Sequence, residues 1–194
     1  MWTMAGQKDA WDGFYVRNGR AWGGNTPLPE CVSGDVLDLG CGNGKTVSSL
    51  LGRGCKVTGV DFSGVAIEMC RERFPDCAFV CCDARSLPFA DSTFDWVTAV
   101  HVLENLDEDQ LSETAKEMGR VLRPGGGVFI RMFTANDFRS SKRESQQIGY
   151  TFHDEPSIEG AFDSFLVVSH VVDEKTTRFG ALRSVREIIL GKST

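Results

Sequence analysis

The sequence predicts an α/β fold built on a largely parallel sheet, and three features of the chain lead to this prediction. Between residues 34 and 133, short apolar runs alternate with segments of helical periodicity. A glycine-rich turn separates the first apolar run from the first of these helices. Beyond residue 163, two β-rich runs follow one another with no helix between them. Alternating strands and helices form parallel sheets with right-handed crossovers, whereas two directly connected strands pair antiparallel.

Five apolar runs are expected to form the parallel part of the sheet. The run over 94–100 is almost continuously apolar, as in a strand that is buried on both faces. The helix expected over 107–122 is the clearest, because it has one apolar face and acidic residues in its first turn. The segment Pro-Gly-Gly-Gly at 124–127 is expected to stop this helix and turn the chain. The expected strands are 36–39, 56–60, 78–81, 94–100 and 128–133, with further helices at 44–52 and around Ile67, Cys70 and Phe74.

The two ends of the chain differ from this alternating core. The first 35 residues are rich in Trp, Gly and Asn, and we expect a short helix followed by an irregular lead-in. The β-rich runs 164–172 and 184–190 are expected to form an antiparallel hairpin on the sheet edge. A short helix over 155–162 would precede this hairpin, and residues 134–156 would form an insertion after the fifth strand.

Length and composition predict one globular domain. The chain has 194 residues, of which 41% are hydrophobic and 25% charged, which suits a single sizeable core. No apolar run approaches the roughly 18 residues of a membrane span, and residues 1–10 lack the pattern of a secretory signal. We therefore expect a cytoplasmic protein. Its single domain over 1–194 would comprise a lead-in (1–33), a core (34–133), an insertion with a helix (134–163) and a hairpin (164–194).

The seven cysteines are expected to be reduced and mostly structural. Their number is odd, no signal peptide points to an oxidising compartment, and the absence of a C-x-x-C pair speaks against a metal site. Most of them fall in expected strands and helices, where a thiol acts as a small apolar side chain. Redox or substrate chemistry at the adjacent Cys81 and Cys82 is the alternative.

The charge pattern disfavours nucleic acid as a partner. The net charge is −6, whereas nucleic-acid binding needs a basic face that displaces counterions. Short basic clusters occur at 139–143 and at Arg178, Arg183 and Arg186, and both are interpreted as solvated surface. For the first cluster, the alternative is contact with an anionic small molecule or an acidic peptide.

Residues 36–44, with the sequence VLDLGCGNG, place a glycine-rich turn between an expected strand and an expected helix. Free backbone N–H groups and the positive end of the helix dipole then face a ligand, and glycine lets that ligand approach closely. Dinucleotide-binding turns read G-x-G-x-x-G, and Lys45 stands here at the position of the third glycine. This difference counts against a dinucleotide.

Acidic residues are expected at the ends of three successive strands. A buried Asp38 needs a polar partner, either a cationic ligand amine or local backbone N–H groups. Asp61 lies about 20 residues past the glycines, where an acid reaches ribose hydroxyls, and Phe62 can pack on an adenine face. Asp83 can accept the adenine exocyclic amine while the N–H of Ala84 reaches a ring nitrogen. Because the carboxyl ends of parallel strands face one crevice, these acids together indicate a nucleoside site.

Seven short motifs occur in an order and spacing that are jointly specific. They are VLDLGCGNG at 36–44, VDFS at 60–63, DA at 83–84, LPF at 87–89, FDWV at 94–97, HVL at 101–103 and RVLRPGG at 120–126. In these motifs, over about half of its length, the chain resembles the class I S-adenosylmethionine-dependent methyltransferases, in particular the small methyltransferase type 11-like group. The resemblance implies S-adenosylmethionine as cofactor. It also implies a Rossmann-like, doubly wound sheet of seven strands in the order 3-2-1-4-5-7-6, with strand seven antiparallel.

The resemblance further implies roles for the matching residues. His101 would line the pocket in which the methyl group is transferred. The family often has a second histidine where this chain has Asn105, so a base role tied to that histidine is not carried over. The cofactor would be held at its methionine part by Asp38, Gly40 and Gly42, at its ribose and adenine by Asp61 and Phe62, and at the adenine edge by Asp83 and Ala84, with Cys41 and Cys82 beside them.

The N-terminal aromatic residues resemble the W-x-x-x-Y…W lead-in of small-molecule methyltransferases. In that group the segment folds over the cofactor as a lid, which Trp11, Asp12, Tyr15 and Trp22 would form here. The alternative is that two of these aromatic side chains simply cover the sheet.

Methyl transfer from a sulfonium is an in-line displacement with an excellent leaving group, so orientation and water exclusion are expected to dominate. No catalytic residue is assigned. If the acceptor must lose a proton, His101 and Tyr15 are the candidate bases, although His101 can instead simply hydrogen-bond the cofactor or the backbone. Poorer candidates are His153, Asp154 and Tyr150, and His170 is expected to be structural.

The expected function is methyl transfer to a small molecule. Protein or RNA methylation is the alternative within the same fold. An NAD(P)-dependent oxidoreductase and a catalytically silent cofactor-binding subunit are the alternatives from other classes. The sequence assigns neither the acceptor atom nor the oligomeric state.

Overall fold

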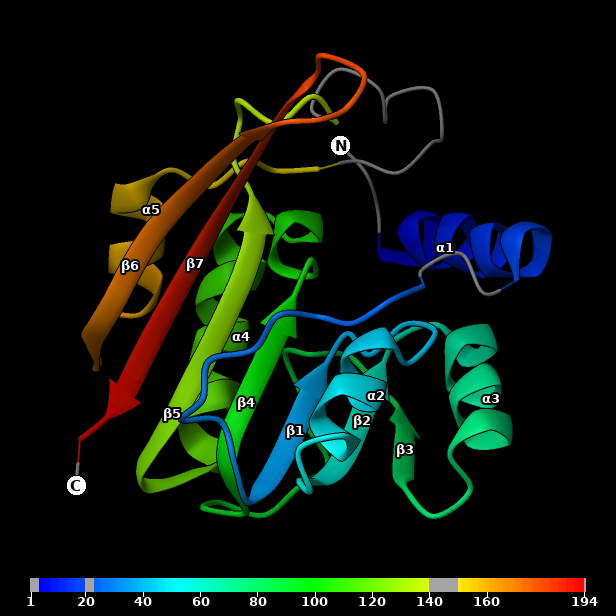
Figure 1. Ribbon diagram of the computed structural model, residues 1–194. Helices are drawn as coiled ribbons and strands as arrows, with labels where there is room; N and C mark the ends of the chain where they lie inside the picture. Colours follow the sequence, from blue (N-terminus) through cyan, green and yellow to red (C-terminus); the bar gives the residue numbers. More distant parts are fainter. Residues whose placement is uncertain (1–3, 20–22, 140–149, 194) are drawn as a thin grey trace.

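The computed structural model describes residues 4–19, 23–139 and 150–193. In this part of the chain, seven strands form one mixed sheet in the order β3-β2-β1-β4-β5-β7-β6 (Figure 1). The predicted strand order is confirmed. The strands are β1 (Asp35–Leu39), β2 (Lys56–Asp61), β3 (Ala78–Cys81), β4 (Phe94–Val100), β5 (Leu122–Phe133), β6 (Phe165–Thr176) and β7 (Leu182–Lys192).

The direction of each strand also agrees with the prediction. Strands β1 to β5 pair in parallel, in a register that sets Asp38 opposite Thr98 of β4. Strand β7 pairs antiparallel with both β5 and β6, so the predicted hairpin at the sheet edge is confirmed. Carboxyl ends of parallel strands meet at one edge of a sheet, which is the upper edge in Figure 1.

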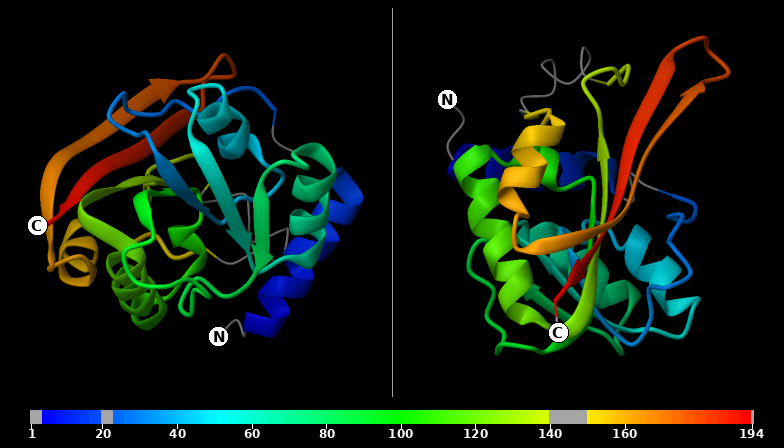
Figure 2. Two further views of the ribbon diagram at one scale, coloured as in Figure 1. Left: turned by 90° about the horizontal axis from the view of Figure 1, so that it is seen from below. Right: turned by 90° about the vertical axis from the view of Figure 1, so that its left-hand side faces the viewer.

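Helices cover both faces of the sheet (Figure 2). Apolar side chains of α4 and α5 pack with the strands in one buried cluster, and those of α2 and α3 pack in a second cluster on the other face. A third, smaller cluster joins α1 to α3 through Trp11, Tyr15 and Ala66. The helices are α1 (Met4–Asn18), α2 (Lys45–Leu51), α3 (Gly64–Arg73), α4 (Glu108–Val121) and α5 (Glu155–Ala161), with a short 3₁₀ helix at Leu103–Asn105.

The start of β5 differs from the prediction. The sequence predicted a turn at 124–127, but the strand already begins at Leu122, which pairs with Phe94 of β4. An irregularity between Phe94 and Trp96 then shifts the register, so that Trp96 lies opposite Gly127. A Cβ on Gly127 would lie 2.6 Å from the Trp96 ring. The glycines therefore serve both the turn, with Gly125 at a φ of 75°, and the close side-chain packing of a bulged strand.

The hairpin is longer than predicted. Its ladder extends to the pair Thr176 and Leu182, beyond the expected ends at 172 and 184. Figure 1 shows its tip rising above the edge at which β4 and β5 end. The hairpin thus carries side chains of β6 and β7 to the sheet edge where the acidic residues at the strand ends were predicted.

The described helices and cysteines give two further observations. No helix in residues 4–19, 23–139 or 150–193 has the length and apolar character needed to cross a membrane. Cys41, Cys55 and Cys70 are buried free thiols in the core, as the structural interpretation of the cysteines predicted. Cys81 is an exposed free thiol.

Candidate active site

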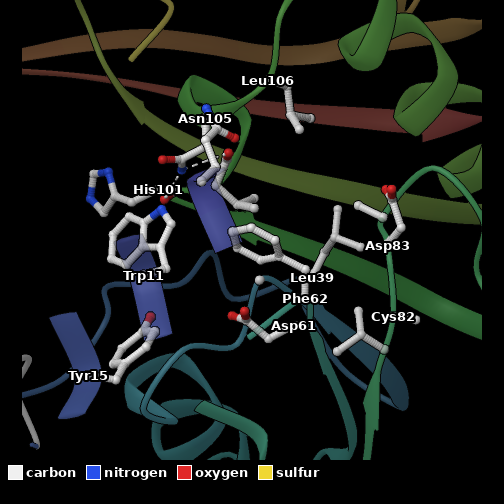
Figure 3. A pocket seen from close by; sticks show the side chains of 15 residues that line it. Trp11, Tyr15, Leu39, Asp61, Phe62, Cys82, Asp83, His101, Asn105 and Leu106 are labelled. Carbon is white, nitrogen blue, oxygen red and sulfur yellow. Dashed lines mark hydrogen bonds between the residues drawn. The ribbon is translucent and has the colours of Figure 1, made fainter. Parts of the chain in front are cut away.

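A cavity, called here the first cavity, opens at the carboxyl ends of β1, β2, β3 and β4, beneath α1 (Figure 3). Its wall includes Gly40 after β1, Asp61 and Phe62 at the end of β2, and His101 after β4. Residues 82–84 after β3 complete one side. The structure therefore brings together seven of the residues that the sequence predicted for a cofactor: Gly40, Asp61, Phe62, Cys82, Asp83, Ala84 and His101.

The glycine turn after β1 has a backbone that other residues rarely adopt. Gly40 and Gly42 have φ angles of 66° and 52°. A Cβ on Gly40 would lie 2.5 Å from a methyl carbon of Val102, and a Cβ on Gly42 would lie 2.7 Å from the Tyr15 hydroxyl oxygen. The turn therefore packs closely against its neighbours, and α2 begins directly after it.

Asp61 is buried at the end of β2 and organises this turn. Its Oδ2 accepts a hydrogen bond from the Gly42 N–H at 2.9 Å, and its Oδ1 accepts one from the Ser63 N–H at 2.9 Å. Burial raises the pKa of Asp61 to about 6, although the same N–H bonds oppose the shift. A carboxylate has about four acceptor sites, so both oxygens can still accept a ligand hydroxyl.

Asp38 lies behind the turn rather than on the wall of the first cavity. Its Oδ1 accepts a hydrogen bond from the Thr98 hydroxyl at 2.8 Å, not from the local backbone N–H groups considered as an alternative. Its Oδ2 is buried and has no hydrogen-bond partner among the described residues. Burial raises the pKa of Asp38 to about 7, and the nearby Asp61 adds to this effect. A cationic group near Oδ2 would favour the ionised form.

The side of the cavity beyond β3 carries an ion pair that the sequence did not predict. Asp83 accepts hydrogen bonds from the Arg85 side chain at 2.7–3.1 Å and from the Arg85 N–H at 2.9 Å. These bonds hold the pKa of Asp83 below its usual range. The N–H of Ala84 makes no hydrogen bond to the described backbone. Burial raises the pKa of the adjacent Cys82 to about 11, so its thiol stays protonated at neutral pH.

His101 and Glu104 form a pair beside this cavity. His101 has a φ of 59° and stacks on Phe133, with ring centroids 3.9 Å apart. Its Nδ1 lies 3.1 Å from Oε1 of Glu104, a carboxylate with no exposed surface. Burial lowers the pKa of His101, Glu104 raises it, and the cations Arg131 and Arg139 lower it again. The imidazole is therefore neutral at pH 7, and the tautomer that donates Nδ1–H to Glu104 leaves Nε2 as an acceptor.

No role was predicted for Glu104, although its spacing of three residues from His101 is visible in the sequence. Asn105, at the position of the family's second histidine, donates hydrogen bonds to the carbonyl of Val102 at 3.0 Å and to that of His101 at 3.4 Å. This side chain therefore supports the backbone that carries His101.

Helix α1 covers both the turn and the first cavity. Trp11 and Tyr15 are buried and stack with ring centroids 5.7 Å apart, and both line the cavity. Asp12 accepts a hydrogen bond from the Ser63 hydroxyl at 2.5 Å. Ser63 also caps α3 and directly follows the segment that carries Asp61 and Phe62. The covering role expected for the N-terminal aromatics thus has a physical basis for Trp11 and Tyr15, whereas Trp22 lies outside the described residues.

The poorer candidates His153 and Asp154 lie elsewhere, as does His170, which was predicted to be structural. His153 is buried, with Nε2 3.1 Å from the Leu103 carbonyl oxygen and Nδ1 3.1 Å from Glu108. Asp154 caps the N-terminus of α5. His170, in β6, lies 3.2 Å from Glu155. None of these three side chains lines the first or the second cavity.

A second, larger cavity adjoins the first and shares with it Trp11, Tyr15, Gly40 and His101. Cys41, Gly42 and Lys45 line it beside the glycine turn. Its opposite wall comes from β5, from the segments flanking 140–149, and from the hairpin of β6 and β7. The shared residues place His101 at the junction of two compartments.

The sheet order, the glycine turn and the acids at successive strand ends define a class of protein that binds a nucleoside-containing cofactor at the carboxyl edge of its sheet. Residues 36–126 match the family model described as a methyltransferase domain. Over these residues the chain carries a methyltransferase domain, and the comparisons support a class I S-adenosylmethionine-dependent methyltransferase.

Similar proteins carry the same domain. A demethylmenaquinone methyltransferase of Renibacterium salmoninarum is 36% identical over 103 residues, which is 53% of this chain and 43% of that protein. The sterol 4-C-methyltransferase strm-1 of Caenorhabditis elegans is 33% identical over 115 residues, which is 56% of this chain and 34% of that protein. The chain thus spans less than half the length of these curated relatives. A solved S-adenosylmethionine-dependent methyltransferase of Methanosarcina mazei superposes with a TM-score of 0.70 at 26% identity, covering 86% of this chain and 94% of that one.

The residues present fit S-adenosylmethionine in two ways. The Oδ2 of Asp38, which has no partner among the described residues, can be satisfied by the cofactor's amine, directly or through a water molecule. Gly40 lines both cavities and Gly42 lines the second, so the turn presents backbone rather than a side chain to a ligand there. Both observations concern the methionine end of the cofactor, where the resemblance placed these residues.

Proposed function

We propose that this chain transfers a methyl group from S-adenosylmethionine to a small molecule that binds in the second cavity. The observation that carries the proposal is the junction of the two cavities at His101, Gly40, Trp11 and Tyr15. The named activities of the quinone and sterol methyltransferases among the relatives support a small-molecule acceptor. The single-domain division and the cytoplasmic location remain predictions of the sequence.

Methyl transfer requires the protein mainly to orient the cofactor and the acceptor and to exclude water. S-adenosylmethionine, when bound, supplies a methyl group on a sulfonium, whose departure needs no acid. Asp61 and the glycine turn would fix the cofactor's ribose and methionine part. Trp11 and Tyr15 of α1 would exclude water from the junction. His101, kept neutral by burial and oriented by Glu104, would take a proton from the acceptor at Nε2.

Asp61→Asn tests the cofactor site. The substitution keeps the shape of the side chain but removes its charge and one acceptor, and hydrogen bonds to charged groups are each worth about 1.5–3 kcal/mol. We expect the dissociation constant for S-adenosylmethionine to rise at least about tenfold, roughly 1.4 kcal/mol. Isothermal titration calorimetry measures this change, with the exposed Asp76→Asn as the matched control. Equal affinities for wild type and Asp61→Asn would show that the site is assigned wrongly.

Binding and labelling experiments distinguish the proposed function from the alternative functions. An RNA methyltransferase would bind RNA with a steep dependence on salt concentration, which the net charge of −6 disfavours. Retained cofactor binding without label transfer to any metabolite, protein or RNA fraction would instead indicate a silent cofactor-binding subunit.

A further inference from the structure

The second cavity concentrates positive charge in a protein whose net charge is −6. Five cationic side chains line it, together with one acidic side chain, Asp173. They come from α2, β5, the segment after β5, β6 and β7, so distant parts of the sequence converge here. The cations are Lys45, Arg131, Arg139, Lys175 and Arg183.

Ion pairs within the described residues neutralise only part of this positive charge. Arg131 forms an ion pair with Glu187, and Lys175 pairs with Asp173 at 2.7 Å. Lys45 and Arg183 have no ion pair among the described residues, and the buried Nε of Arg183 has no hydrogen-bond partner there. Two cations therefore remain uncompensated by the part of the chain that the structure describes.

Arg139 is the third cation with unused hydrogen-bonding capacity. Its guanidinium lies over the rings of Phe133 and Phe138, 4.6 Å and 4.8 Å from their centroids. Its Nη1 is 3.8 Å from Asp137, and this buried nitrogen makes no hydrogen bond within the described residues. The carboxylate of Asp137 is already engaged by the N–H groups of Arg139 and Ser184. Stacking thus holds the guanidinium in place at the cavity wall, and the buried Nη1 keeps a donor that the described residues leave unsatisfied.

The electrostatics of the wall agree with this geometry. Burial lowers the pKa of Lys45, of Arg131 and of Arg139, and repulsion from Arg183 lowers each of them further. Like charges held this close in a partly buried wall destabilise one another unless an anion joins them. An oxyanion is the ligand that would satisfy both their charge and their free N–H donors.

We propose that the methyl acceptor is a small molecule with an oxyanion group, a carboxylate or a phosphate, bound by Arg139 and Arg183 with support from Lys45. The inference rests on the proposed function, since it names the substrate class of the same site. Guanidinium groups bind planar or tetrahedral oxyanions through two parallel hydrogen bonds. Because His101 lines the same cavity, an anchored oxyanion would leave the rest of the acceptor near the junction.

Binding of simple anions tests the proposal without any need for activity. The protein, saturated with S-adenosylhomocysteine, is titrated with inorganic phosphate and with acetate at constant ionic strength, followed by NMR. We expect saturable binding of at least one anion, weakened at least about tenfold in Arg183→Gln and in Arg139→Gln, because each removes a charge-assisted bond. Arg183→Lys should lose less of the anion affinity, since lysine keeps the positive charge. The control is Arg178→Gln, an exposed cation of the same hairpin that stacks on Phe179.

The possible outcomes separate this proposal from its rivals. No saturable binding of either anion, or equal binding by wild type and both glutamine variants, overturns it. If the two variants lose affinity for S-adenosylhomocysteine instead, the cations hold the cofactor's own carboxylate, which also overturns it. A circular dichroism spectrum and a melting curve for each variant show that the fold is retained.

Activity then identifies the kind of oxyanion. Metabolites are separated on an anion exchanger, and each fraction is incubated with methyl-labelled cofactor, before and after treatment with phosphatase. We expect label in the fraction retained by the exchanger. If the acceptor carries a phosphate, phosphatase treatment abolishes this labelling, and if it carries a carboxylate, the labelling is unchanged. Label only in unretained fractions contradicts the proposal. Absence of label in every fraction, with anion binding intact, contradicts the proposed function but not the anion site.

Discussion

Gly40→Ala is expected to weaken binding of S-adenosylmethionine by about a hundredfold or more, roughly 2.7 kcal/mol. The new Cβ would lie 2.5 Å from a methyl carbon of Val102, at a φ of 66° that alanine rarely adopts. The turn would have to move, and with it the backbone that faces the cofactor. Calorimetric titration of the folded variant measures the loss.

Gly64→Ala is the matched control for this experiment. Gly64 is the first residue of α3, and a Cβ there would meet no other atom within 4 Å. We expect its cofactor affinity to stay within about twofold of wild type. If Gly40→Ala binds as tightly as Gly64→Ala while both are folded, the glycine turn does not hold the cofactor.

His101→Asn is expected to lower kcat by about 10²–10⁴, the usual contribution of a general base. Its Nε2 is the proposed proton acceptor, and asparagine offers no basic nitrogen at that place. Cofactor affinity should change far less than kcat, because the glycine turn and Asp61 remain intact. A fall in kcat of less than about fivefold in a steady-state assay would mean that His101 only lines the cavity.

The pH dependence of His101 provides a check that needs no acceptor. Because its folded pKa lies below 6.5, the neutral base forms as pH rises through that lowered value and prevails at pH 7. Removing an anion lowers the pKa further, so Glu104→Gln should shift the imidazole titration to lower pH. Removing a cation does the opposite, so Arg139→Gln should shift it to higher pH. NMR titration of the imidazole protons measures both shifts, and shifts of the same sign would contradict the arrangement.

Local sequence patterns were sufficient for most of the fold. Alternating apolar runs and helical stripes predicted β3 and β4 at their observed bounds, and the directly connected β-rich runs predicted the antiparallel hairpin. The start predicted for the fifth strand was wrong, because β5 begins at Leu122 rather than Val128. Gly127 permits close contact with Trp96, a partner 31 residues earlier, and no local pattern reveals that packing.

The candidate site was predicted less completely, because burial and pairing depend on distant residues. Asp61 and Phe62 reach the first cavity as expected, since strand ends fix their position. Asp38 faces Thr98 behind the turn because of the register between β1 and β4. Arg139 and Arg183, interpreted as solvated surface, are partly buried and line one cavity wall, because the hairpin carries Arg183 there. For Arg139, this position agrees with the alternative of contact with an anionic small molecule.

The covering helix α1 has a kinetic consequence. Trp11 and Tyr15 belong to the walls of both cavities, and Asp12 fastens the same helix to Ser63. A displacement of α1 would therefore open both cavities together. We expect release of the spent cofactor and entry of the next acceptor to depend on this one movement.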